Sequence, residues 1–183
     1  MKYFKHILFS FFIIALFSNP FRLSADTVED SVFNSTYEKF LYDNDIPIHY
    51  IDNRFHFDEN VKLEDIIRFL DLLTLEQYII ANNIQNANTT RAYDGGPYRR
   101  NFIYVNYGNI EIVRDVVSPT RLVYDPSHPD GLRVGDMAGY VEYPNIDIAS
   151  EMTDLINVAR IYLEVLEECN LRNIDLPDKY GSK

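Results

Sequence analysis

Apolar residues recur every three or four positions in two long stretches of this chain, and each stretch predicts an amphipathic helix. The first expected helix spans residues 61–84, with Asn60 as its capping residue, and the second spans 147–169. The inward positions of the first helix form a heptad seam that Gln77 interrupts: Leu63, Ile66, Leu70, Leu73, Ile80 and Ile84. The seam of the second helix comprises Ile148, Met152, Leu155, Ala159, Tyr162 and Leu166, and ends at Cys169.

Between the two helices, over residues 98–143, the apolar pattern changes to a period of two, which is typical of strands. We expect strands at 102–105 and 110–113, joined by a turn at Tyr107-Gly108-Asn109, and the runs at 122–124 and 140–143 can pair with them. The connections are too short for parallel crossovers, so the sheet should be small and antiparallel. The expected fold class is therefore α+β, with two long, coiled-coil-like helices paired antiparallel around this insert.

The start of the chain has the pattern of a secretion signal. Lys2 and Lys5 precede an apolar run over 7–17, and Leu23-Ser24-Ala25 forms a plausible cleavage site before Asp26. Residues 1–25 thus predict a cleavable signal peptide, export to the periplasm and only transient contact with a membrane. The apolar run is shorter than the roughly 20 residues that span a bilayer. An uncleaved membrane anchor is the alternative.

Two further segments flank the helices. Residues 26–60 form an acidic extension, in which 32–41 fits a short amphipathic helix and two extended pieces meet at a turn, Asp52-Asn53. Its aromatic residues would otherwise be exposed, so we expect this extension to be ordered. Asn170, Asn173 and Pro177 should end the second helix and leave residues 170–183 as a loose tail.

Composition limits the classes of function. Of the 183 residues, 46% are hydrophobic, which excludes wholesale disorder, and the formal net charge is −11. Such acidity argues against nucleic-acid binding through bulk electrostatics. The single cysteine, Cys169, allows no intrachain disulfide, and we expect it to be a buried hydrophobic residue.

The segment 81–100 separates the first helix from the insert. Its asparagines, Asn82, Asn83, Asn86 and Asn88, are poor residues for a helix interior and suit a helix end that turns into an ordered loop. Gly95-Gly96-Pro97 then makes a second break in the chain.

The order of residues in this segment resembles the N-terminal signature of flagellar basal-body rod proteins of the FlgC, proximal-rod type. The resemblance lies in residues 82–90, which read NNIQNANTT, and in Gly95, Gly96, Pro97, Tyr98, Arg99 and Arg100. Two further matches follow in the same order, at 121–130 and at 139–145 leading into 151–162. Together they cover roughly residues 63–168.

The resemblance implies a structural component of the basal body that assembles with copies of itself and with other rod proteins. It further implies that the terminal helices pack together into a tubular core and that the signature residues serve assembly. Neither enzymatic activity, a cofactor nor a small-molecule substrate is implied.

Three features depart from the rod-protein pattern. Rod subunits lack a cleaved leader, their last helix continues to the chain end, and Gln85 here replaces a small residue. These departures favour an alternative, in which the chain is a secreted periplasmic accessory or binding module derived from a rod protein. A bacterium whose flagella lie in the periplasm would make secretion a sensible route to the rod.

Candidate chemistry is sparse. Arg91, Arg99 and Arg100 can bind carboxylates of a neighbouring subunit, or can be solvated surface residues. Asp125, His128 and Asp130 form the best candidate for a metal or acid–base cluster, although such residues in prolyl loops mostly form turns. The sequence contains none of the common metalloprotease, phosphate-loop or serine-nucleophile motifs.

Overall fold

A computed structural model describes residues 36–51 and 54–180. The expected signal peptide, Val32 of the expected short helix and the turn at Asp52-Asn53 lie outside these residues.

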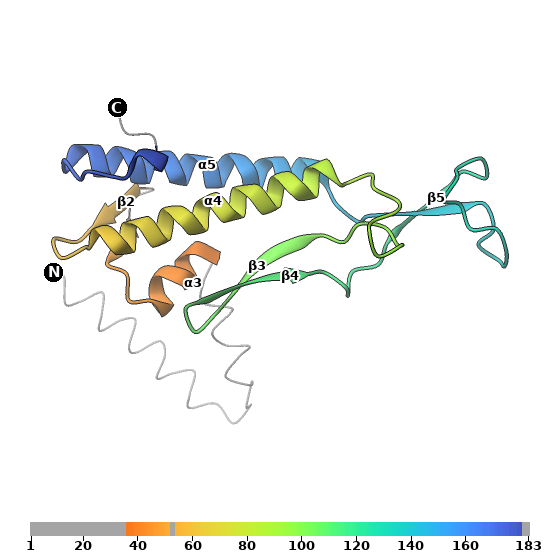
Figure 1. The fold of residues 1–183 in the computed structure, drawn as a ribbon, viewed down its shortest axis with the longest axis horizontal. Helices are drawn as coiled ribbons and strands as arrows, with labels where there is room; N and C mark the ends of the chain where they lie inside the picture. Colours follow the sequence, from red (N-terminus) through yellow and green to blue (C-terminus); the bar gives the residue numbers. More distant parts are fainter. Residues whose placement is uncertain (1–35, 52–53, 181–183) are drawn as a thin grey trace, which may run out of the picture. The chain divides into compact units, whose positions relative to one another are not determined.

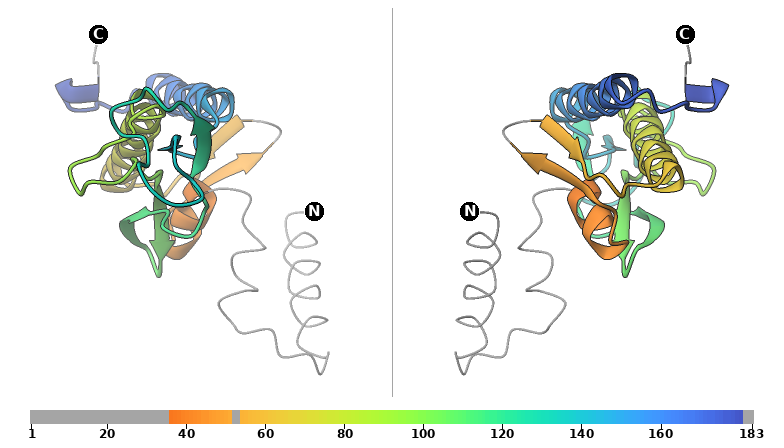
Figure 2. Two further views of the ribbon diagram at one scale, coloured as in Figure 1. Left: turned by 90° about the vertical axis from the view of Figure 1, so that its right-hand side faces the viewer. Right: turned by 90° about the vertical axis from the view of Figure 1, so that its left-hand side faces the viewer.

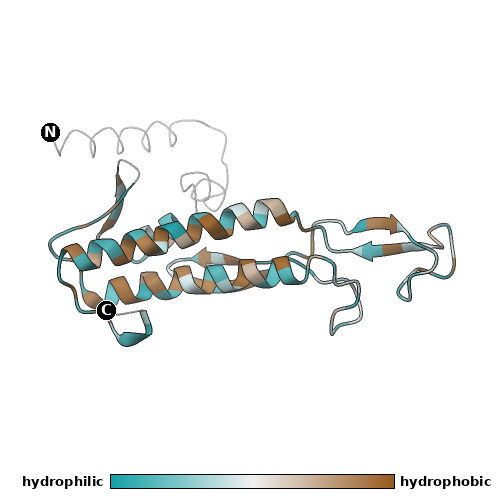
Figure 3. Ribbon diagram, turned by 90° about the horizontal axis from the view of Figure 1, so that it is seen from above, coloured by the Kyte–Doolittle hydropathy of each residue, from teal (hydrophilic) through white to brown (hydrophobic). Residues whose placement is uncertain are grey.

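Two long helices, α4 (Leu63–Gln85) and α5 (Ile148–Leu171), run side by side in opposite directions (Figure 1). Apolar segments recur along both of them (Figure 3). Lys62, not the expected Asn60, is the N-cap residue of α4. Asp147 caps α5, because its side chain accepts a hydrogen bond of 3.0 Å from the Ala149 backbone N–H. Coiled-coil packing of the pair stays a prediction.

The acidic extension forms a helix and a hairpin that cover the helix pair. Helix α3 (Thr36–Asp43) lies against α4. Strands β1 (Ile48–Ile51) and β2 (Arg54–Phe57) form an antiparallel hairpin, and β2 lies against α5 (Figure 2). Phe40 and Phe55 are buried, and the Phe55 ring lies 5.6 Å from the Phe69 ring of α4, centroid to centroid. The expectation of an ordered extension therefore holds for residues 36–51 and 54–60.

Four strands form the insert, but they make two separate hairpins. Strand β3 (Asn101–Asn106) pairs with β4 (Asn109–Arg114), and β5 (Arg121–Tyr124) pairs with β6 (Tyr140–Tyr143). The suggestion that the later runs pair with the earlier ones is wrong. After β4, the Asp115 carboxylate accepts hydrogen bonds from the backbone N–H groups of Val117 and Ser118, so the chain turns away before β5 begins. We call residues 121–143 the arm.

The segment after α5 folds back onto the helix pair. Asn173 has a φ of +55°, and the Ile174 N–H donates to the Cys169 carbonyl at 2.9 Å, which is the Schellman pattern of a helix end. Ile174 and Leu176 then pack against the core, and a short 3₁₀ helix, Asp178–Tyr180, buries the Tyr180 ring. We call residues 172–180 the strap. The expectation of a loose tail is wrong for the strap.

The buried face of α5 differs from its expected seam. Val158, Ile161, Val165 and Cys169 are the buried apolar residues, whereas Leu155, Ala159, Tyr162 and Leu166 are half-buried. Ile148 and Met152, together with Leu63 of α4, are exposed, which corrects their assignment as inward positions. The reason is that α5 packs on β2 as well as on α4, so its buried face turns toward the hairpin.

Candidate functional site: the junction and the outer face of α5

A buried asparagine connects the two helices with the insert. Asn83, near the end of α4, is 0% exposed. Its side-chain N–H groups donate to the Asn101 carbonyl at 2.8 Å and to Glu151 Oε2 at 3.0 Å. Its side-chain oxygen accepts from the Asn101 backbone N–H at 2.9 Å and from the Tyr98 hydroxyl at 3.0 Å. Both donors and both acceptor positions of the amide are thus satisfied.

Glu151 completes this network from the first turn of α5. It is 3% exposed, and its Oε1 accepts a hydrogen bond from Arg100 Nε, so a guanidinium balances the buried carboxylate. The Asn101 side chain donates to the Tyr98 hydroxyl at 2.8 Å, and burial raises the pKa of that hydroxyl. We call Asn83, Tyr98, Arg100, Asn101 and Glu151 the junction network.

Some of the signature residues expected to serve assembly are therefore used inside the subunit itself. Asn83, Tyr98 and Arg100 bind within their own chain, and sequence reasoning missed their partners Asn101 and Glu151. A charged residue among the apolar positions at the start of α5 was the signal that could have revealed Glu151.

The asparagine-rich loop is ordered, as expected. Asn86 is the C-cap of α4, and its side chain donates to the Asn82 carbonyl at 2.9 Å and accepts from the Thr89 hydroxyl at 3.1 Å. The Tyr98 N–H donates to the Thr89 carbonyl at 2.9 Å, which closes the loop. Gly95, at a φ of +92°, takes the left-handed conformation that the break requires, ahead of Gly96 and Pro97. Asn88 is exposed.

The remaining arginines also have partners within the chain. Arg91 forms an ion pair with Asp130 at 3.0 Å, and the Thr90 hydroxyl donates to the same carboxylate at 2.8 Å. Arg99 donates to the Ser118 carbonyl at 2.7 Å. Together with the Arg100–Glu151 pair, these contacts give every arginine of the expected intersubunit cluster a partner. All three partners belong to this chain: a carboxylate for Arg91 and for Arg100, and a backbone carbonyl for Arg99.

Asp125, His128 and Asp130 have structural roles. Asp125 Oδ1 accepts hydrogen bonds from Ser127, which lower the pKa of the Asp125 carboxyl. His128 Nδ1 accepts from the Asp130 N–H at 3.1 Å, and Asp130 holds the signature loop. Within residues 36–51 and 54–180, no three potential ligands are grouped to hold a metal ion.

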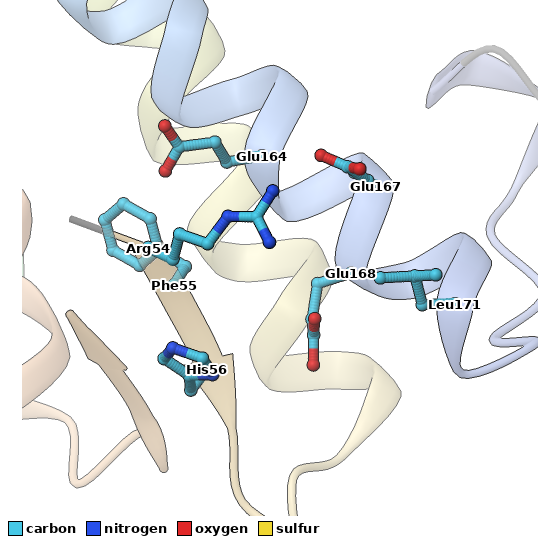
Figure 4. Close-up of a pocket in the computed structure, with 7 residues that line it drawn as sticks. All are labelled: Arg54, Phe55, His56, Glu164, Glu167, Glu168 and Leu171. Carbon is cyan, nitrogen blue, oxygen red and sulfur yellow. The ribbon is translucent and has the colours of Figure 1, made fainter. Parts of the chain in front are cut away.

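A shallow pocket lies between β2 and the last turns of α5. Arg54, Phe55, His56, Glu164, Glu167, Glu168 and Leu171 line it (Figure 4). Its volume is about 40 Å³, room for only a water molecule or two, and ligand pockets are several times larger. Glu164 pairs with Arg160 of α5, and Glu168 pairs with Arg172, the first residue of the strap. The pocket is therefore too small for a substrate.

The pKa values of half-buried Glu76 and buried Cys169 are both raised. Burial, and secondly the charge of Asp154 on α5, raise the pKa of Glu76 on α4 to about 7. One oxygen of that carboxyl has no hydrogen-bond partner among the described residues. Burial raises the pKa of the Cys169 thiol to about 11, so it stays protonated and unreactive, in agreement with its expected role.

Helix α5 carries a row of exposed apolar side chains. Ile148, Met152, Ile156 and Leu163 are exposed, with Met152 at 52% and Ile156 at 65%. At about 3.6 residues per turn, their spacing of four, four and seven places them on one face of the helix. We call these residues the α5 stripe. Such a row of apolar side chains is unusual on a helix that only water covers.

Within the described part of the chain, no helix is both long enough and apolar enough to cross a membrane.

Comparison with known proteins identifies relatives of one kind, although no family model matches the chain. The chain is 37% identical over 107 residues to the flagellar basal-body rod protein FlgC of Borreliella burgdorferi, a match that covers 46% of this chain and 70% of that protein. It is 29% identical over 102 residues to FlgC of Salmonella typhimurium, covering 50% and 73%. It is 30% identical over 110 residues to FlgC of Bacillus subtilis, covering 46% and 71%. The identity and the coverage show that the chain belongs to the FlgC family of flagellar basal-body rod proteins.

Proposed function

We propose that this chain is a structural subunit of the flagellar basal-body rod and that it packs the α5 stripe against a helix of a neighbouring rod subunit. Its family indicates a structural component of the rod and not an enzyme. The observation that carries the finer proposal is the exposure of four large apolar side chains along one face of α5.

The energetics favour such packing. Complete burial of one Ile, Leu or Met side chain contributes about 1.5–3 kcal/mol. The stripe has the spacing with which one helix packs against another, so a neighbouring helix can cover all four residues together. In a polymer every subunit makes the same contact, and modest contacts then support a stable rod.

The junction network has a supporting role in this proposal. Asn83 and Glu151 join the two helices at the end from which the insert leaves, and Asn101 begins β3. A fully hydrogen-bonded polar cluster has one good arrangement, because every alternative leaves buried groups unpaired. The signature residues therefore serve assembly indirectly, by holding the subunit in one shape.

Incorporation into basal bodies tests the role of the stripe. Met152→Glu introduces a charge in the middle of the stripe, whereas Asn157→Glu introduces the same charge at an exposed position on another face of α5. We expect the Met152→Glu chain to be missing from purified basal bodies and the Asn157→Glu chain to be retained. Equal incorporation of both would show that the stripe is not the contact.

A deletion strain tests rod membership itself. If flagella stay intact without this chain, and the chain is absent from purified basal bodies, the secreted accessory module is the better description.

We further propose that residues 1–25 direct export to the periplasm. The basic start, the apolar run and the small residues before Asp26 support this proposal. Mass spectrometry of the exported protein should find a chain that begins at Asp26. A chain that still begins at Met1 would contradict it.

A further inference from the structure

The strap covers part of the surface that α4 and α5 present together. The Tyr180 hydroxyl donates to Asp71 Oδ1 of α4 at 2.7 Å, and Lys179 Nζ lies 3.1 Å from the same oxygen. Half-buried Tyr162 of α5 packs against the same hydrophobic cluster as Ile174 and Leu176 of the strap, and burial and, secondly, the charge of Asp71 raise the pKa of Tyr162. The strap, which continues from α5, therefore bridges the two helices at the level of Asp71 and Tyr162.

Two helical turns closer to the junction network, the strap no longer covers this α4–α5 surface. Tyr78 is seven positions after Asp71 and shares its face of α4, while Leu155 is seven positions before Tyr162 and shares its face of α5. The helices are antiparallel, so both steps lead toward the junction network, where Asn83 meets Glu151. Tyr78 is 65% exposed, and Met152 of the α5 stripe is exposed beside half-buried Leu155.

We propose that the strap is an intramolecular plug. It occupies one half of an α4–α5 surface whose open half holds Tyr78 with Ile148, Met152 and Ile156 of the α5 stripe, and its release extends the surface on which a second copy of this chain packs. The proposal rests on the proposed function of the α5 stripe as an assembly contact.

Two observations favour a second copy as the occupant and a plug that can be released. The covered half shows which chemistry suits this surface, because apolar Ile174 and Leu176 and the Tyr180 ring cover it. A subunit helix with an apolar stripe offers the same chemistry and continues along the same surface. The far end of the strap is held by polar contacts of Lys179 and Tyr180 with the exposed carboxylate of Asp71, and exposed ion pairs contribute little to stability. Its first residue, Arg172, donates to the Phe57 and Asp58 carbonyls and is kept in both strap variants.

Sedimentation velocity of the full-length chain over a concentration series tests the proposal. Leu176→Asp with Tyr180→Ala should release the strap, and a chain that ends at Asn173 removes it. Asp175→Ala is the matched control, since Asp175 is an exposed residue of the same strap. We expect the two strap variants to self-associate about tenfold more tightly than the wild type and the control to be unchanged. Adding Met152→Glu to either variant should abolish the gain.

Three outcomes would overturn the proposal: association that stays at the wild-type level, a gain that Met152→Glu does not reverse, or loss of the helical circular-dichroism signal in both strap variants. The last outcome would show that the strap is part of the folding core and not a plug. Each of these outcomes concerns the strap alone. The role of the stripe is decided separately, by the incorporation of Met152→Glu and Asn157→Glu chains into basal bodies.

Discussion

Asn83 and Glu151 are 68 residues apart in the sequence, and a 3.0 Å hydrogen bond between their side chains joins the end of α4 to the start of α5. Both side chains are buried, so each depends on the other for part of its polar pairing. The insert leaves α4 and returns to α5 at this point, which makes the pair the fixed base of both hairpins.

Removing the Asn83 amide should therefore destabilise the protein strongly. Asn83→Ala leaves Glu151, the Asn101 N–H and the Tyr98 hydroxyl each short of a hydrogen bond in a buried place. We expect a loss of about 2–4 kcal/mol in the free energy of unfolding, measured by urea denaturation. Asn88→Ala, at an exposed position of the same loop, should change it by less than about 0.5 kcal/mol.

The Glu76 carboxyl should make stability depend on pH. Its folded pKa of about 7 lies above the ordinary value of 4.5, so the folded state holds the proton more tightly than the unfolded state. This contribution is fully present below pH 4.5, falls between pH 4.5 and 7, and is lost above 7. It amounts to at most about 3 kcal/mol.

Urea denaturation at pH 5 and pH 8 measures the Glu76 effect. The wild type should be more stable at pH 5, and Glu76→Gln should remove most of the difference because it cannot ionise. A pH dependence that survives in Glu76→Gln would assign the effect to other groups.

The position of the buried face of α5 can be tested by paired truncations. Ile161→Ala removes a fully buried side chain and should cost about 2–4 kcal/mol, because it loses transfer energy and leaves a cavity. Met152→Ala truncates an exposed side chain of similar size and should cost less than about 0.5 kcal/mol. Thermal melts followed by circular dichroism compare them. Equal losses would restore the seam predicted from the heptad pattern.

Gly139 should not tolerate a side chain. It has a φ of +86°, and a Cβ atom there would lie 2.7 Å from Cε2 of the Tyr124 ring. We expect Gly139→Ala to destabilise the arm by about 1–2 kcal/mol, detected as faster hydrogen exchange of β5 and β6 amides. Gly96→Ala, where a Cβ meets open space, is the control and should leave exchange in the arm unchanged.

Periodicity in the sequence predicted the helices to within two residues at most ends, because their apolar spacing is long and regular. The periodicity placed the inward face of α5 wrongly. Val158 and Val165 are buried in place of Met152 because α5 also packs against β2, which comes from a distant segment of the chain. The strap was missed for a related reason. Short runs such as 174–180 carry no period, and only the partner Asp71 shows that Tyr180 is anchored.

Asn83 and Glu151 show the same limit at the site. Local rules describe Asn83 as a helix-end residue and Glu151 as a favourable acid in a first turn. Both descriptions agree with the structure, but neither predicts the hydrogen bond between the two side chains. A pair formed across the insert leaves no local pattern in the sequence.

The arm has a consequence for the motions of this subunit. Among the described residues, none of the apolar side chains of β5 and β6 belongs to the main hydrophobic cluster, which contains residues of α3, α4, α5 and the β1–β2 and β3–β4 hairpins. The arm can therefore open without separating the two helices. Its amide protons should exchange through this local opening at a small free-energy cost, whereas those around Leu70 and Leu73 should exchange only when the whole domain unfolds. A subunit built in this way can adjust its arm to a neighbour while its helix pair keeps a constant shape.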